Sequence, residues 1–238
     1  MDMHTIQQIR ENERLSHMEQ YANMPLYESG GWLSKPIKTV LELLPLLEEH
    51  TAVRCLDLGC GIGRNCIAVA QYFQEIPCTI DCVDLLDLAI RRLRENAETF
   101  GVSRCIHGIV QTIEDFPIPP DTYNLVLGVS ALEHMDSKEH FAHKMGEICD
   151  GIRPNGMVCL VINSDVTETD AATGEVLVPQ FEVNLTTGEL LELLRTCFGQ
   201  WSVIKETVVH QRYFIPRGNI MSDLNTNVVT LVARKGSN

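Results

Sequence analysis

The chain has 238 residues, of which 45% are hydrophobic, so it is long enough to bury one sizeable core. Its 19 basic and 32 acidic residues give a formal net charge of −13, which argues against nucleic-acid binding and favours a small-molecule partner. The N-terminal segment is polar and no apolar run reaches the length of a membrane span, so we expect a cytoplasmic protein without a membrane partner.

The nine cysteines lack the spacing of a metal site. Cys55, Cys82 and Cys159 fall within apolar segments that predict strands. We therefore expect buried, reduced thiols and no metal site.

Residues 1–50 predict a helical lead-in to a single α/β domain over residues 51–238. Tyr21, Tyr27 and Trp32, together with two adjacent glycines, suit either a lid over a site or a packing arm. A helix that Pro45 bends, and that covers one face of a sheet, is then predicted from the helical spacing of Ile37, Val40, Leu41, Leu44 and Leu47.

A buried strand predicted over residues 53–58 runs directly into a turn that contains Gly59, Gly61 and Gly63, and a helix is expected over about residues 64–74. Glycines let the backbone turn tightly and approach a ligand where a β-carbon would collide. The start of the following helix offers unpaired N–H groups. This arrangement predicts a site for a nucleotide-like cofactor.

The next predicted strand, residues 79–84, ends in Asp84. This acidic residue lies about 20 residues beyond the last glycine, where a carboxylate accepts hydrogen bonds from both hydroxyls of a ribose. The dinucleotide fingerprint places its third glycine one residue later than Gly63, where this chain has Arg64. A nicotinamide or flavin dinucleotide is therefore disfavoured.

Helical and strand patterns alternate as far as residue 162. A helix with one apolar stripe (Ile90, Leu93, Ala97 and Phe100) is followed by strands over 105–110 and 123–129, a helix capped by Asp136 with Glu139 three residues later, and a strand over 157–162. This alternation predicts a parallel sheet with helices on both faces.

The pattern changes after residue 163. We expect a polar loop to about residue 177 and a helix that begins at Thr186 with Glu189 three residues later. Two segments with high strand propensity, 201–214 and 220–234, flank a turn over 216–219 and predict a terminal hairpin.

These segments resemble the successive motifs of the Rossmann-like (class I) S-adenosylmethionine-dependent methyltransferases, on residues 56–65, Asp84, 123–134 and 151–156. A weaker resemblance, to the tellurite-resistance methyltransferases, lies in residues 185–190, His210, 218–219 and 230–235. The resemblance implies a three-layer α/β fold whose sheet is parallel except for a terminal antiparallel hairpin strand. It also implies S-adenosylmethionine as cofactor and methyl transfer to a small molecule, with soft and oxyanion nucleophiles among the candidates.

Carried over to this chain, the resemblance implies a cofactor site made of Asp57, Gly59, Cys60, Gly61, Gly63, Asn65, Asp84, Leu85, Thr112 and Ile113. Two roles stay open for Asp57, which is expected either to accept from the methionine amine or to cap the N–H groups of the turn. Leu85 is expected to lie against adenine. Many family members carry an aspartate after the third strand, where this chain offers Thr112 and Ile113, with Gln111 as the alternative adenine contact.

Two groups of residues are candidates for the acceptor site. The first group is associated with the strand over 123–129 and comprises Asn124, Ser130, Glu133 and His134. Within it, Glu133 or His134 is expected either to act as a base or only to cap and pack. The second lies in the hairpin, where His210, Arg212 and Arg217 correspond to residues that help to hold an oxyanion. Residues 218–221 lack a basic residue that the tellurite enzymes show nearby, which leaves tellurite specificity open.

Methyl transfer from a sulfonium requires chiefly that donor and nucleophile be brought together and water excluded. The sequence is therefore interpreted as a methyltransferase with His210, Glu133 and His134 as catalytic candidates. The alternatives are a non-catalytic S-adenosylmethionine-binding regulatory protein and, among enzymes, an aminopropyl transferase on a similar fold.

Overall fold

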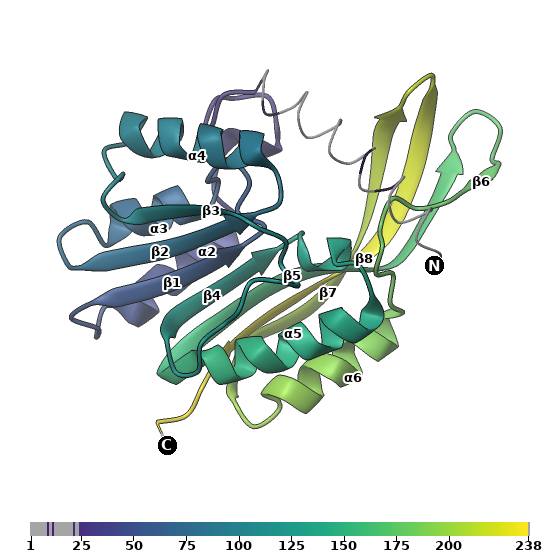
Figure 1. Ribbon diagram of the computed structural model, residues 1–238. Coiled ribbons are helices and arrows are strands. Elements are labelled where there is room, and N and C mark those ends of the chain that lie inside the picture. Colours follow the sequence, from purple (N-terminus) through teal and green to yellow (C-terminus); the bar gives the residue numbers. More distant parts are fainter. Residues whose placement is uncertain (1–8, 10, 12–20, 22–23, 238) are drawn as a thin grey trace.

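The computed structural model describes residues 9, 11, 21 and 24–237. Figure 1 shows a central sheet with helices on both faces. The strand order is β3-β2-β1-β4-β5-β8-β7, and β6 pairs with β5 beside this path. The strands are β1 (Val53–Leu58), β2 (Cys78–Asp84), β3 (Ile106–Val110), β4 (Tyr123–Val129), β5 (Ile152–Asp170), β6 (Val176–Leu177), β7 (Ser202–Arg217) and β8 (Ile220–Arg234).

Strands β1 to β5 pair in parallel through β3-β2-β1-β4-β5. Strand β8 is antiparallel to both of its neighbours, β5 and β7. This confirms the predicted sheet, which is parallel except where the terminal hairpin inserts an antiparallel strand. Because the parallel strands all end at one edge of the sheet, the loops that follow them meet there.

Alternate side chains of the strands face two helical layers. Leu125 and Leu127 of β4 belong to one apolar cluster, while Val126 belongs to the other. The first cluster packs under α2 (Lys38–Leu43), α3 (Cys66–Tyr72) and α4 (Asp87–Thr99), and the second under α5 (Lys138–Gly151) and α6 (Thr187–Phe198). Three short 3-10 helices complete the described chain: η1 (Trp32–Ser34), η2 (Leu44–Leu47) and η3 (Leu132–His134).

Two predicted helices differ from those found. The helix expected over 37–47 ends as α2 at Leu43 and continues as the 3-10 helix η2, because Pro45 lacks the N–H that an α-helix requires there. Leu41, which was predicted to belong to the apolar stripe of this helix, is 43% exposed and is not part of the buried core. Helix α3 begins only at Cys66, since residues 61–65 belong to the turn.

The N-cap of α5 is Ser137, and the prediction of Asp136 was wrong. The Ser137 hydroxyl accepts from the backbone N–H of His140, whereas the Asp136 carboxylate is engaged by the Ser137 hydroxyl and the His140 ring. The predicted cap of α6 is confirmed, because Thr186 and Glu189 form a complete capping box.

The polar loop predicted from residue 163 is largely strand. Strand β5 continues to Asp170 because the long strand β8 pairs with it over residues 222–225. Within this extension Val166 and Glu168 are buried, and Glu168 bonds Arg217 and Ser222. Long-range pairing therefore overrides a polar composition that is typical of a loop.

Cys55, Cys82 and Cys159 are buried in strands as predicted, and all nine cysteines are free. Among the described helices, none is long and apolar enough to cross a membrane. The division of the chain at residue 50 stays a prediction.

Candidate active site

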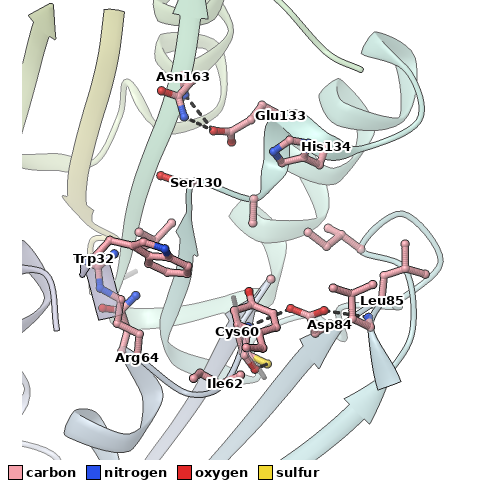
Figure 2. Close-up of a pocket in the computed structure, with 18 of the residues that line it drawn as sticks. Trp32, Cys60, Ile62, Arg64, Asp84, Leu85, Ser130, Glu133, His134 and Asn163 are labelled. Carbon is pink, nitrogen blue, oxygen red and sulfur yellow. Dashed lines mark hydrogen bonds between the residues drawn. The ribbon is translucent and has the colours of Figure 1, made fainter. Parts of the chain in front are cut away.

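A cavity of about 450 Å³ lies where the parallel strands end. Its walls include the turn after β1, the end of β2, the loop after β3 and the segment after β4 (Figure 2). The lining residues are Tyr21, Trp32, Leu33, Gly59, Cys60, Gly61, Ile62, Arg64, Asn65, Asp84, Leu85, Leu86, Thr112, Ile113, Glu114, Val129, Ser130, Ala131, Glu133, His134, Asn163, Phe181, Glu182 and Tyr213. The fold thus brings the glycine turn and the predicted acceptor-side residues after β4 to one cavity.

The glycine turn requires glycine at all three positions. Gly59, Gly61 and Gly63 have φ values of 71°, 53° and 100°, in the left-handed region that side chains disfavour. A β-carbon on Gly59 would lie 2.1 Å from that of Ala131, and one on Gly63 would lie 2.7 Å from the Leu93 side chain. Gly59 and Gly61 line the cavity, whereas Gly63 serves the packing of the turn against α4.

Asp84 stands at the end of β2 and orders the turn. Its Oδ2 accepts from the N–H of Gly61 at 2.9 Å, and its Oδ1 accepts from the N–H of Leu86 at 2.9 Å. The carboxylate also lines the cavity. Asp84 is therefore held in a fixed orientation beside the turn.

Asp57 is buried beneath the turn and does not line the cavity. Burial raises the pKa of this carboxyl to about 7, and the nearby negative charge of Asp84 adds to the effect. Its Oδ2 is buried with no hydrogen-bond partner among the described residues. The N–H groups of Gly59 and Cys60 donate to the Val83 carbonyl, and that of Gly61 donates to Asp84. Both expected roles of Asp57 therefore stay predictions.

The other predicted cofactor residues divide in the same way. Cys60, Asn65, Leu85, Thr112 and Ile113 line the cavity, whereas the alternative adenine contact Gln111 does not. Burial raises the pKa of the Cys60 thiol, which keeps it protonated near neutrality and favours a packing role.

Asn65 joins the cavity to the segment before α2. Its Oδ1 accepts from the backbone N–H of Ile37, which fixes that segment beside the turn.

Aromatic residues from the N-terminal 35 residues form one wall. The Tyr21 hydroxyl lies 2.9 Å from the position of a β-carbon on Gly61, so this side chain sits directly over the turn. Trp32 stacks under the Arg64 guanidinium at 5.5 Å, and Arg64 donates to the carbonyl of Lys35. Tyr21 and Trp32 thus belong to the cavity, while most of the segment proposed as a lid lies outside the described residues.

Glu133 and His134 stand at the opposite end of the cavity (Figure 2). Glu133 Oε1 accepts from the backbone and side-chain N–H groups of Asn163, and His134 Nδ1 lies 3.1 Å from Glu182 Oε2. Just before them, Ser130 has a φ of 51°, a strained value for a residue other than glycine. Strain of this kind is typical of functional sites.

The hairpin residues of the second candidate group do not reach the cavity. His210 is exposed on β7 and, three residues from the lining residue Tyr213, points to the opposite face of the strand. Arg212 pairs with Asp223, and Arg217 with Glu168. Asn124 also lies elsewhere, because it stands at the start of β4 and accepts from the N–H of Arg54.

Several polar and aromatic lining residues were not predicted from the sequence as site residues, among them Arg64, Asn163, Phe181, Glu182 and Tyr213. Asn163 directly follows the predicted strand 157–162, so its place at the carboxyl edge was a usable signal. Phe181 and Glu182 lie in an irregular loop between β6 and α6, which no periodicity marks.

The sheet order and the glycine turn at the carboxyl edge define the class I fold of the S-adenosylmethionine-dependent methyltransferases. Residues 55–156 match the family described as "Methyltransferase domain". This match implies S-adenosylmethionine as the cofactor, and the absence of β-carbons at Gly59 and Gly61 beside a fixed carboxylate fits that molecule.

Curated relatives are similar over part of their length. Ajmaline N-methyltransferase from Rauvolfia serpentina is 27% identical over 134 residues, which cover 54% of this chain and 45% of that protein. The human tRNA N(3)-cytidine methyltransferase METTL2B is 24% identical over 179 residues, which cover 69% of this chain and 46% of that protein. The chain thus spans about half the length of the curated relatives it matches.

Solved structures share the fold at low identity. The [4+2]-cyclase SpnF is 16% identical with a TM-score of 0.64, over 98% of this chain and 97% of that one. TehB from Haemophilus influenzae is 16% identical with a TM-score of 0.61, over 84% of this chain and 62% of that one. At such identity the likeness concerns the fold alone, as the name of the cyclase illustrates.

Proposed function

We propose that this protein transfers the methyl group of S-adenosylmethionine to a small-molecule acceptor and releases S-adenosylhomocysteine. The observation that carries the proposal is the shared cavity: the glycine turn and Asp84 stand at one end, and Glu133 and His134 at the other. A donor held at the first end presents its methyl group to an acceptor at the second. Catalysis then rests chiefly on proximity and on exclusion of water.

Within this proposal, Gly59 and Gly61 permit close approach of the cofactor and Asp84 accepts from the ribose hydroxyls. Leu85, Thr112 and Ile113 line the adenine end. Bound S-adenosylmethionine supplies an activated methyl group, so the protein needs no metal for the transfer.

A small molecule is favoured over nucleic acid by charge. The formal net charge is −13, and Asp84, Glu114, Glu133 and Glu182 all line the cavity. A polyphosphate backbone would be repelled by such a surface. A tRNA acceptor is the second candidate, since METTL2B is described as a tRNA methyltransferase.

The test measures S-adenosylhomocysteine release with a panel of small amines, alcohols and thiols and with bulk tRNA. Turnover with a small molecule is expected. Turnover with tRNA alone would replace the small-molecule proposal. Cofactor binding without any turnover would favour a regulatory S-adenosylmethionine-binding protein.

A further inference from the structure

The acceptor end of the cavity holds a buried carboxylate with spare acceptor capacity. Glu133 is 1% exposed, its Oε1 is fixed by Asn163, and its Oε2 has no hydrogen-bond partner in the described part of the chain. Asn163 is itself held, because its Oδ1 accepts from the hydroxyl of Thr226. A buried anion without a cationic partner is costly, so this oxygen fits a ligand that brings N–H groups and positive charge.

A second carboxylate adds negative charge at the same end. Glu182 is 8% exposed and its Oε2 faces His134 Nδ1. The loop that carries it is tied to η3, because the Val183 N–H donates to the carbonyl of Glu133 at 2.9 Å. Among the described lining residues Arg64 is the one arginine or lysine, and it packs on Trp32 in the N-terminal wall.

Aromatic rings complete this end. Phe181 stacks on His134 with 5.1 Å between ring centroids, and both residues line the cavity. Ring faces attract cations, whereas they offer nothing to an oxyanion. The buried carboxylate, the aromatic rings and the negative charge at this end therefore all favour a cationic ligand.

From these contacts we infer that the acceptor is an amine, bound as its ammonium through Glu133 Oε2. This inference rests on the proposed function and names the substrate class. The ammonium gives one proton to the Glu133 carboxylate, and the freed nitrogen lone pair forms a bond to the donor methyl carbon. The C–S bond breaks with its electron pair on sulfur, and the N-methylated product leaves as a cation while Glu133 returns its proton to water.

The deciding experiment compares three ligands by calorimetry: S-adenosylhomocysteine, S-adenosylmethionine and sinefungin. Sinefungin carries an ammonium-bearing carbon in place of the sulfur, so it presents N–H groups toward the acceptor end. A charge-assisted hydrogen bond to Glu133 should make sinefungin bind at least about 10-fold tighter than the other two. Glu133→Gln should abolish this preference, while Glu114→Gln, the same change at the adenine end, should retain it.

The outcomes separate the inference from the proposed function. Binding of S-adenosylhomocysteine without a sinefungin preference in the unaltered protein overturns the amine subsite and leaves the methyltransferase proposal standing, and this arm needs no variant to fold. If sinefungin and S-adenosylmethionine both bind more tightly than S-adenosylhomocysteine by the same factor, Glu133 serves the sulfonium charge. That result would also overturn the amine subsite. If none of the three binds, both proposals fall.

Discussion

Replacement of Asp84 by alanine tests the cofactor site most directly. The carboxylate is held by the N–H groups of Gly61 and Leu86, each at 2.9 Å, so its orientation is fixed before a ligand arrives. Two hydrogen bonds from ribose hydroxyls to a charged acceptor contribute roughly 1.5 to 3 kcal/mol each. Their loss amounts to roughly 3 to 6 kcal/mol, so the Kd for S-adenosylhomocysteine should rise at least about 100-fold.

The assay is calorimetric titration with S-adenosylhomocysteine, after circular dichroism has shown that the variant is folded. Asp84→Asn retains one acceptor oxygen without the charge, so its Kd for S-adenosylhomocysteine should lie between those of the parent and of Asp84→Ala. Asp87→Ala is the matched control, because this exposed carboxylate pairs with Arg91 along α4 and does not line the cavity. An unchanged Kd in folded Asp84→Ala would refute the assignment of the ribose to this residue.

Three further expectations concern other parts of the site. Gly61 has a φ of 53° and faces the Tyr21 hydroxyl, so affinity for S-adenosylhomocysteine should fall with Gly61→Ala and further with Gly61→Val; parental affinity in both would mean that no ligand approaches the turn. Burial raises the folded-state pKa of Asp57 from 3.8 to about 7, so between these pH values the folded protein binds more protons than the unfolded chain. The contribution of this carboxyl to the unfolding free energy therefore falls by roughly 4 kcal/mol as the pH rises from below 3.8 to above about 7. Urea titrations at several pH values should show that decline in the parent and not in Asp57→Asn; parallel pH profiles would contradict it. Since His210 lies outside the cavity, His210→Ala should leave S-adenosylhomocysteine affinity and turnover near parental values, whereas a marked loss of turnover would restore the hairpin as an acceptor site.

Sequence reasoning located the cofactor end of the site because its signals are local. A left-handed turn needs glycine at Gly59 and Gly61 whatever surrounds it, and a parallel strand that ends in Asp84 must deliver that carboxylate to the same edge. The capping box of α6 is equally local, since it lies within the four residues from Thr186 to Glu189.

The acceptor end depended on contacts between distant segments. Glu133 is oriented by Asn163, thirty residues away, and Glu182 reaches His134 from a loop without periodicity. The length of β5 was likewise decided by its pairing with β8.

The sequence by itself therefore determined the alternating α/β architecture, the glycine turn and the carboxylate beside it, because periodicity and backbone conformation act within a few residues. Only the tertiary structure decided which polar side chains share the cavity. It turned His210 to the opposite face of β7 from Tyr213, because side chains alternate along a strand and its pairing with β8 fixes the register. It also left Glu133 Oε2 buried and unpartnered at the acceptor end, since that depends on how segments far apart in the chain pack together.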